Sequence, residues 1–129
     1  MHVAIVCTAL LGLLLFGLGL AVSNTRNRTS TIAGSSQDPA DFLYKMVRAH
    51  GNTAEYAPMF AVLFLLVGER NPATWVLWTM GLATACRYLI AIGMIVSPTL
   101  AKPHPLRFAG ALGTYVTGIA LSIAAFTAA

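Results

Sequence analysis

The sequence predicts an all-α integral membrane protein, built as a bundle of four transmembrane helices. Of its 129 residues, 57% are hydrophobic and 9% are charged, whereas a soluble domain carries roughly a quarter charged residues. Four long apolar segments alternate with shorter polar stretches, and crossing a bilayer as a helix takes about 20 such residues. These segments cover about 3–22, 50–68, 73–97 and 107–128, so residues 1–129 are expected to form one transmembrane domain.

The first apolar segment, VAIVCTALLGLLLFGLGLAV, has two interpretations. Small residues before Asn24 are typical of a signal-peptide cleavage site. However, no lysine or arginine precedes the segment, and it is longer than the usual apolar core of about 7–15 residues. We therefore expect a retained membrane span, followed over residues 23–37 by a polar and irregular loop.

The second helix is expected to begin before its apolar part. Asp38, Pro39 and Asp41 suit the N-cap, N1 and N3 positions of a helix that runs to Gly68. Such a helix is about 45 Å long at 1.5 Å per residue. It would exceed the hydrocarbon thickness, so its first turns should lie outside the apolar layer.

The third and fourth helices are bounded by prolines. Asn71-Pro72 repeats the capping pattern before the third segment, Pro98 ends it, and the stretch KPHP at 102–105 leads into the fourth. The fourth segment carries small residues at every fourth position, which predicts close helix packing. These residues are Gly110, Thr114, Gly118 and Ser122.

Charge and cysteine usage narrow the function classes. The net charge is +4, and the basic residues lie mostly in the first and third loops or beside them. The positive-inside rule then places those two loops in the cytoplasm and both termini on the outer side. No basic cluster interleaved with aromatics indicates nucleic-acid binding. Cys7 and Cys86 are far apart and without a metal-ligand pattern, so neither a disulfide framework nor a metal site is expected.

The start of the second apolar run, RAHGNTAEYAP, concentrates polar residues on one helix face. At 100° per residue, Arg48, Asn52, Glu55 and Met59 fall within about 60° of one another, with Tyr56 beside them and His50 almost opposite. Three of these residues also have a purely structural interpretation. Arg48 would extend its side chain to the lipid headgroups, Asn52 would form an interhelical hydrogen bond, and His50 would lie at the membrane interface.

The third segment contains one charge, Arg87, near mid-bilayer. Burying a charge at that depth costs about 3 kcal/mol, so Arg87 should face the bundle interior and be paired. Glu55 reaches a comparable depth from the second helix, which makes it the expected partner. The pair either lines a polar site open to the cytoplasm or is a purely structural ion pair.

The stretch RAHGNTAEYAPMFAVLFLL resembles the signature of the MAPEG superfamily, the membrane-associated proteins in eicosanoid and glutathione metabolism. Members carry Arg-Ala-x-x-Asn-x-x-Glu-Tyr/Phe-x-Pro at the start of the second of four transmembrane helices. The matching residues here are Arg48, Ala49, Asn52, Glu55, Tyr56 and Pro58. The chain length and the layout of four spans are also similar to those of the family.

This resemblance implies a homotrimer that binds glutathione as co-substrate between neighbouring subunits and acts on lipophilic small molecules from the bilayer. The glutathione-binding residues it implies are Arg26, with Arg28 as the other candidate, Arg48, His50, Asn52, Glu55, Tyr56 and Arg87. The chemistry agrees with such a ligand, because arginines bind carboxylates bidentately and a carboxylate such as Glu55 accepts from an ammonium group.

The expected reaction needs the glutathione thiol as thiolate, which nearby cations stabilise. The resemblance makes Arg107, at the head of the fourth helix, the candidate catalytic residue. Two positions depart from the family pattern: Met94 stands where a tyrosine is usual, and Ile90 where a polar or aromatic residue is usual.

Three functions follow in order of preference. The first is a glutathione transferase or peroxidase acting on lipophilic electrophiles. The second is a weakly active or inactive trimeric binding or scaffold protein of the same fold, which Met94 and Ile90 favour. The third is a transporter or channel subunit, which one intramembrane arginine and one glutamate per chain serve poorly.

Overall fold

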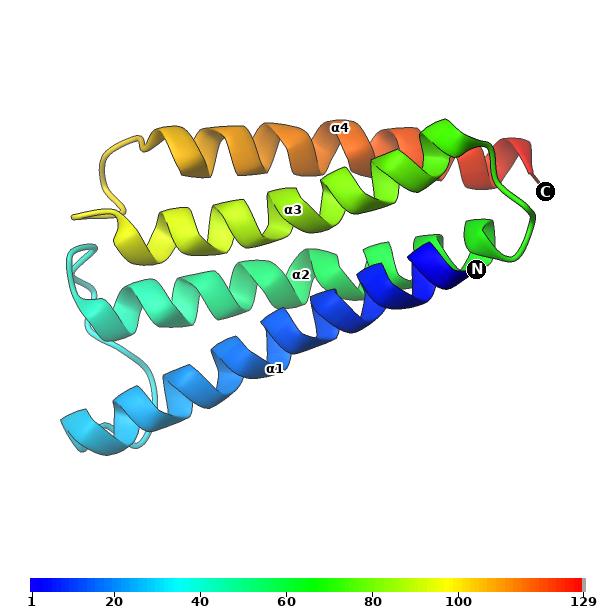
Figure 1. Cartoon of the computed structure of the whole chain (residues 1–129). Coiled ribbons are helices and arrows are strands. Elements are labelled where there is room, and N and C mark those ends of the chain that lie inside the picture. Colours follow the sequence, from blue (N-terminus) through cyan, green and yellow to red (C-terminus); the bar gives the residue numbers. More distant parts are fainter. Residues whose placement is uncertain (129) are drawn as a thin grey trace.

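The computed structural model describes residues 1–128 as four helices, each antiparallel to the one before it (Figure 1). The helices are α1 (His2–Thr29), α2 (Phe42–Gly68), α3 (Thr74–Val96) and α4 (Pro105–Thr127). Figure 1 shows the α1–α2 and α3–α4 connections together at one end, which we call the two-loop end. Both chain termini and the α2–α3 connection lie at the opposite end, which we call the terminal end.

Three of the helices, α1, α3 and α4, are long and apolar enough to cross a membrane. At about 1.5 Å per residue, the 23 residues of α3 or α4 span roughly 35 Å. The chain is therefore a multi-pass integral membrane protein. Helix α2 has 27 residues and a similar length, but its first half is more polar, and its crossing of the bilayer stays a prediction.

Helix α1 is longer than its apolar segment. It continues to Thr29 and ends at Ser30, which has a left-handed φ of 53° and donates its N–H to the carbonyls of Arg26 and Asn27. The hydroxyl of Thr25 also donates back to the Ala21 carbonyl, at 2.8 Å. The prediction of an irregular loop from residue 23 was therefore wrong for residues 23–29, because a helix that leaves the bilayer needs no apolar side chains to continue.

The N-cap of α2 is Asp41, not Asp38. The Asp41 carboxylate accepts from the N–H of Tyr44 at 2.8 Å, which satisfies one of the open donors of the first turn. Asp38 closes a separate turn by accepting from the N–H of Ala40 at 2.9 Å. The Pro39 carbonyl accepts from the N–H of Leu100, in the α3–α4 loop, at 2.9 Å. This contact holds the turn outside the helix, which is why the sequence-based cap was displaced by one turn.

Replacing Asp41 by alanine should therefore destabilise the protein by about 1 kcal/mol, the usual loss for a side-chain N-cap. The measurement is the midpoint of unfolding in a mixed-micelle denaturation, followed by circular dichroism. Asp38→Ala is the matched control and should shift the midpoint much less, because Asp38 is exposed and lies outside the helix. Equal shifts for both variants would contradict the assignment of the cap.

Helix α3 also begins later than the proline pattern suggests. Its N-cap is Ala73, which makes no side-chain capping bond. Asn71 instead takes a left-handed φ of 48° in the turn that reverses the chain, a conformation that asparagine tolerates better than most residues. The other end agrees with the sequence, since α3 stops at Val96, before Pro98, and α4 starts with Pro105 at its first position.

Helices α2 and α3 occupy the centre of the bundle. Helix α1 packs against both of them and so does α4, whereas no Cα atom of α1 lies within 8 Å of one in α4 among residues 1–128. One hydrophobic cluster, toward the terminal end, draws on all four helices and includes Leu11, Phe64, Met80 and Leu121. A second cluster, toward the two-loop end, draws on α1, α2 and α3 and includes Leu18, Met46 and Ala91. A layer of polar side chains separates the two clusters.

Glycines allow α3 and α4 to approach closely. A Cβ on Gly110 would lie 2.7 Å from the backbone nitrogen of Ile90 and 2.9 Å from its Cα. A Cβ on Gly113 would clash with the Sγ of Cys86. The predicted small-residue stripe is thus right for Gly110 and Thr114, whereas Gly118 faces Phe60 of α2 at an ordinary distance of 3.5 Å.

Candidate functional site

The polar layer between the hydrophobic clusters is centred on Arg87. Its side chain is 0% exposed, the largest side chain to be so completely buried in residues 1–128. Its Nη2 donates to the side-chain oxygen of Asn52 at 2.6 Å and to the Asn52 backbone carbonyl at 3.0 Å. Its Nη1 donates to the hydroxyl of Thr114 at 3.3 Å. One guanidinium on α3 is thereby bonded to both α2 and α4.

An aromatic ring completes the surroundings of Arg87. The Cζ atom of Arg87 lies 5.0 Å from the centroid of the Tyr56 ring, within range of a cation–π interaction. The Tyr56 ring in turn lies 6.1 Å from that of Tyr115 on α4, tilted by 60°. The Nε of Arg87 is buried and has no hydrogen-bond partner within residues 1–128. The cation is therefore held by neutral oxygens and a ring.

The prediction of an ion pair between Glu55 and Arg87 was wrong within residues 1–128. The hydrogen bonds of Arg87 within residues 1–128 go to Asn52 and Thr114, and Glu55 is exposed on the outer side of α2. The cause is the helical angle: Glu55 and Asn52 are about 60° apart. Asn52 lies at the edge nearest α3 and α4 and reaches the guanidinium first.

The structure brings some of the predicted site residues together and separates others. Asn52, Tyr56 and Arg87 meet in the polar layer. Arg48 and Glu55 flank it on the same stripe of α2, with both side chains exposed. Pro58 adds an acceptor beside them, because its missing N–H leaves the carbonyl of Ala54 without its usual helical donor.

Arg26 and His50 lie apart from that group, on the side of α2 that faces α1. They line a cavity of about 350 Å³, together with Gly19, Val22, Ser23 and Val47. Arg26 donates to the Gly34 carbonyl at 3.3 Å, and its Nε is buried without a partner in the described residues. Arg26 and Arg28 were the two alternatives for a glutathione-binding arginine after the first span. Arg26 lines this cavity, whereas Arg28 is exposed and does not line it.

Arg107 lies in the first turn of α4, at the two-loop end. Its Nη1 donates to the carbonyls of Leu100 and Lys102, at 3.2 and 2.9 Å. These two bonds tie Arg107 to the α3–α4 loop. Both use the same nitrogen, and Nη2 and Nε make none of the hydrogen bonds found within residues 1–128.

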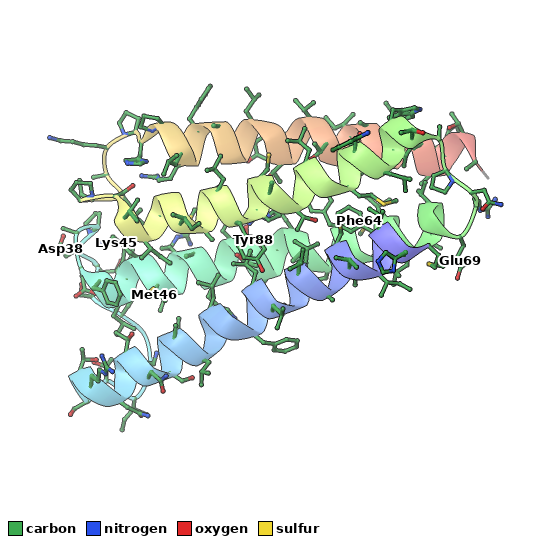
Figure 2. The ribbon with its side chains drawn as sticks, in the orientation of Figure 1. Asp38, Lys45, Met46, Phe64, Glu69 and Tyr88 are labelled. Atoms are coloured by element: carbon green, nitrogen blue, oxygen red, sulfur yellow. The ribbon has the colours of Figure 1, made fainter. Side chains whose placement is uncertain are left out.

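Sequence reasoning missed two buried polar contributors. Thr114 was assigned only to helix packing, although its position near the middle of α4 could have matched it in depth with Arg87. Lys45 lies in the first turns of α2, which were expected outside the apolar layer, yet it is only 9% exposed and its Nζ donates to the Ser97 carbonyl at 3.1 Å. It thereby places a cation at the C-terminus of α3, where the helix dipole favours one. Figure 2 shows Lys45 at the two-loop end of α2 and Glu69 at the terminal end.

The two positions that depart from the family pattern are used for packing. Ile90 is buried against Gly110 of α4, and Met94 packs on the second hydrophobic cluster. Both side chains therefore support the bundle without contributing a hydrogen-bond donor. Within residues 1–128, no group of three or more histidine, cysteine, aspartate or glutamate side chains could hold a metal ion.

Fold and site together define a class of multi-pass membrane protein. Its helix bundle buries an arginine that is hydrogen-bonded to neutral groups, and the exposed charges of Arg48 and Glu55 lie beside it on α2. Comparison with protein families makes this specific. The chain belongs to the MAPEG family, whose model matches residues 4–127. Members of this family generally use glutathione. No curated protein matches the chain in a direct sequence search.

Proposed function

We propose that this chain assembles as a homotrimer, binds glutathione between subunits, and transfers it to lipophilic electrophiles or uses it to reduce them. In this proposal α2 also crosses the membrane. The α1–α2 and α3–α4 loops face the cytoplasm, where glutathione enters, and both termini lie on the outer side. The observation that carries the proposal is the arrangement of the family's α2 segment: Asn52 and Tyr56 are anchored on Arg87, while Arg48 and Glu55 point outward.

The charges on this outward surface complement glutathione, which has two carboxylates and one ammonium group. Arg48 suits a carboxylate, which a guanidinium binds with two parallel hydrogen bonds. Glu55 and the open carbonyl of Ala54 are acceptors suited to the ammonium group. Asn52 and Tyr56 are held in place by their contacts with Arg87, so less conformational freedom is lost on binding.

Two opposite faces of α2 support a site shared between copies of the chain. Arg48 and Glu55 lie on one face, whereas Arg26 and His50 line a cavity on the face toward α1. A single tripeptide does not reach both faces of one helix. If neighbouring copies pack side by side, the Arg26–His50 face of one chain can lie opposite the Arg48–Glu55 face of the next.

The bilayer gives a second reason for a neighbouring subunit. Glu55 is exposed on the lone chain, near the middle of α2. A carboxylate facing hydrocarbon costs about 3 kcal/mol. A second subunit and a bound ammonium group would both remove that cost, because they cover the side chain and pair its charge.

The chemistry proceeds from the glutathione thiolate. In the transferase reaction the sulphur forms a bond to an electrophilic carbon, and the leaving group departs with the bonding electrons. In the peroxidase reaction the sulphur attacks a hydroperoxide oxygen and the O–O bond breaks. One oxygen stays on the sulphur as a sulfenic acid, and the other departs with the lipid as an alkoxide that takes up a proton to become the alcohol. The thiol of a second glutathione then attacks the sulfenic sulphur, which gives the disulfide and releases water. Arg107 is the proposed cation near the thiolate, through its Nη2 and Nε.

The second candidate function is a trimeric binding or scaffold protein with little catalysis. The observation in its favour is that Ile90 and Met94 are occupied with helix packing and supply no donor to a ligand. Glutathione binding would then persist, because Arg48, Asn52, Glu55 and Tyr56 do not depend on those two positions.

Calorimetric titration of the detergent-solubilised protein with glutathione tests the proposal. We expect saturable binding, weakened about tenfold by Arg48→Ala, which removes a charged contact of about 1.4 kcal/mol. Arg70→Ala is the control and should leave affinity unchanged, because Arg70 lies at the terminal end and donates to Ala128. Absence of glutathione binding by the unaltered protein would refute the proposal. Binding without conjugation of an aryl halide or reduction of a lipid hydroperoxide would select the scaffold.

A further inference from the structure

Lys45 is a buried cation that the proposed reaction does not use. It is 9% exposed and lies near the start of α2, at the two-loop end (Figure 2). Within residues 1–128 its ammonium group makes one hydrogen bond, from Nζ to the backbone carbonyl of Ser97 at 3.1 Å. An ammonium group is costly to bury, and a hydrogen bond that it donates is stronger than one between neutral groups. Helix α2 therefore holds Ser97 firmly.

Ser97 connects this contact to the backbone of α4. It is 1% exposed, and its N–H and its hydroxyl both donate to the Gly93 carbonyl, at 3.3 and 2.5 Å. Gly93 lies directly against the start of α4. A Cβ on Gly93 would be 2.9 Å from the backbone nitrogen of Arg107 and 3.1 Å from its Cγ. Arg107 therefore packs on the last turn of α3, which is the turn that Lys45 holds.

The α3–α4 loop is also held between α2 and Arg107. The N–H of Leu100 donates to the carbonyl of Pro39, which comes just before α2, at 2.9 Å. Arg107 donates from Nη1 to the carbonyls of Leu100 and Lys102. Because a guanidinium group is planar and rigid, the position of these carbonyls decides the direction in which Nη2 and Nε point. A displaced loop would therefore turn the guanidinium.

From these contacts we infer that Lys45 is a positioning residue for Arg107. By holding Ser97, it sets where the Arg107 guanidinium lies relative to the thiol of bound glutathione. The Lys45 ammonium group is buried against the end of α3, so it acts through Arg107 and not on the ligand. The inference rests on the proposed function for its significance. Without Lys45, Arg107 stays charged but is held less closely beside the sulphur, and the attraction between cation and thiolate falls with distance.

The positioning contact can be tested without glutathione, by hydrogen–deuterium exchange of the detergent-solubilised protein. Lys45→Met keeps an unbranched side chain and removes the ammonium group. It should speed exchange of the backbone N–H groups in residues 97–108 about tenfold, which corresponds to about 1.4 kcal/mol. Lys102→Met is the matched control, because it removes an exposed lysine from the same loop, and it should leave exchange unchanged.

Two results of the exchange experiment would overturn the inference. One is unchanged exchange over residues 97–108 in Lys45→Met. The other is an equal increase in the α2–α3 connection, at the terminal end, because that would show a general loss of stability and no specific hold on the loop.

Glutathione then decides whether the position matters for the thiol. Lys45→Met should leave glutathione affinity within about twofold, because Arg48 and Glu55 are untouched. It should raise the pKa of the bound thiol, so that the thiolate fraction at neutral pH falls about fivefold, as measured by the ultraviolet absorbance of the thiolate. Lys102→Met should leave this fraction unchanged, which separates positioning from a general loss of positive charge. An unchanged fraction in Lys45→Met would show a merely structural lysine and overturn the inference.

Gly93→Ala tests the same series of contacts at a second point. The new methyl group would press on the backbone of Arg107 and leave the bond between Lys45 and Ser97 in place. It should lower the thiolate fraction as well, and the losses in Gly93→Ala and Lys45→Met should not add in the double variant, because both displace one guanidinium. Gly81→Ala is the matched control, since Gly81 is an exposed α3 glycine with no atom within 4 Å of the position of a Cβ.

Additive losses in the double variant would contradict a shared route through Arg107. If Lys45→Met does not fold, an unchanged thiolate fraction in Gly93→Ala overturns the inference by itself. The measurements also separate this inference from the proposed function. If the unaltered protein binds no glutathione, the proposed function fails, and the exchange experiment still decides whether Lys45 positions Arg107. If glutathione binds but exchange in Lys45→Met is unchanged, the proposed function holds and the inference fails.

Discussion

Replacing Asn52 by leucine is expected to destabilise the bundle by about 3 kcal/mol. The substitution removes the 2.6 Å hydrogen bond between the Asn52 side chain and Nη2 of Arg87. It leaves a guanidinium that is 0% exposed with weaker compensation. Hydrogen bonds to charged groups contribute about 1.5–3 kcal/mol, and leaving a buried charge under-paired costs at least as much. The measurement is unfolding of the solubilised protein in mixed micelles with increasing denaturing detergent.

The double variant Asn52→Leu with Arg87→Met gives the sharper result. Removing both partners abolishes the unpaired charge, so most of the lost stability should return. Glutathione affinity should not return, because both residues belong to the proposed site. Asn24→Leu, at an exposed position near the end of α1, is the matched control and should have little effect. If the double variant were no more stable than Asn52→Leu, the buried charge would not be the origin of the loss.

Gly110→Ala is expected to cost a similar amount, about 3 kcal/mol, through overpacking of α3 against α4. The new methyl group would lie under 3 Å from three atoms of Ile90, and two of these are backbone atoms that no rotamer change can move. The two helices must separate, which also lengthens the bond between Arg87 and Thr114. The same mixed-micelle unfolding experiment measures the effect.

Two other glycine variants provide controls of graded severity. Gly118→Ala should shift stability by less than about 0.5 kcal/mol, since its new methyl group would meet Phe60 at an ordinary 3.5 Å. Gly113→Ala should be destabilising but rescued by Cys86→Ala, because the obstructing atom there is the Sγ of Cys86. A Gly110→Ala protein as stable as Gly118→Ala would show that the helices separate without cost.

The sequence was a good guide to which segments form helices and a poorer one to where they begin. Apolar runs identify spans because a helix in a bilayer must be apolar over most of its length. The residue at which a helix starts depends on which of several neighbouring side chains makes the capping hydrogen bond. Asp38 and Asp41 are equally good caps by residue type, and the contact of Pro39 with Leu100, far along the chain, decides between them.

The candidate site was predictable in composition and not in pairing. A helical wheel correctly gathers Arg48, Asn52 and Glu55 on one stripe and sets His50 apart. It gives no information on which neighbouring helix each edge of the stripe meets. The choice of Asn52 over Glu55 as the partner of Arg87 depends on the positions of α3 and α4 beside α2, which only tertiary packing determines.

The three-helix bonding of Arg87 has a consequence for axial alignment. Apolar ridges of leucine, isoleucine and alanine resemble one another from turn to turn, so a helix could slide by about 5.4 Å, one helical pitch, at modest cost. Such a shift of α4 would carry Thr114 out of reach of the guanidinium, and a shift of α2 would do the same to Asn52. The hydrogen bonds of this single arginine thus select one axial alignment of the helices. The apolar residues around it hold the helices together but do not distinguish one alignment from the next.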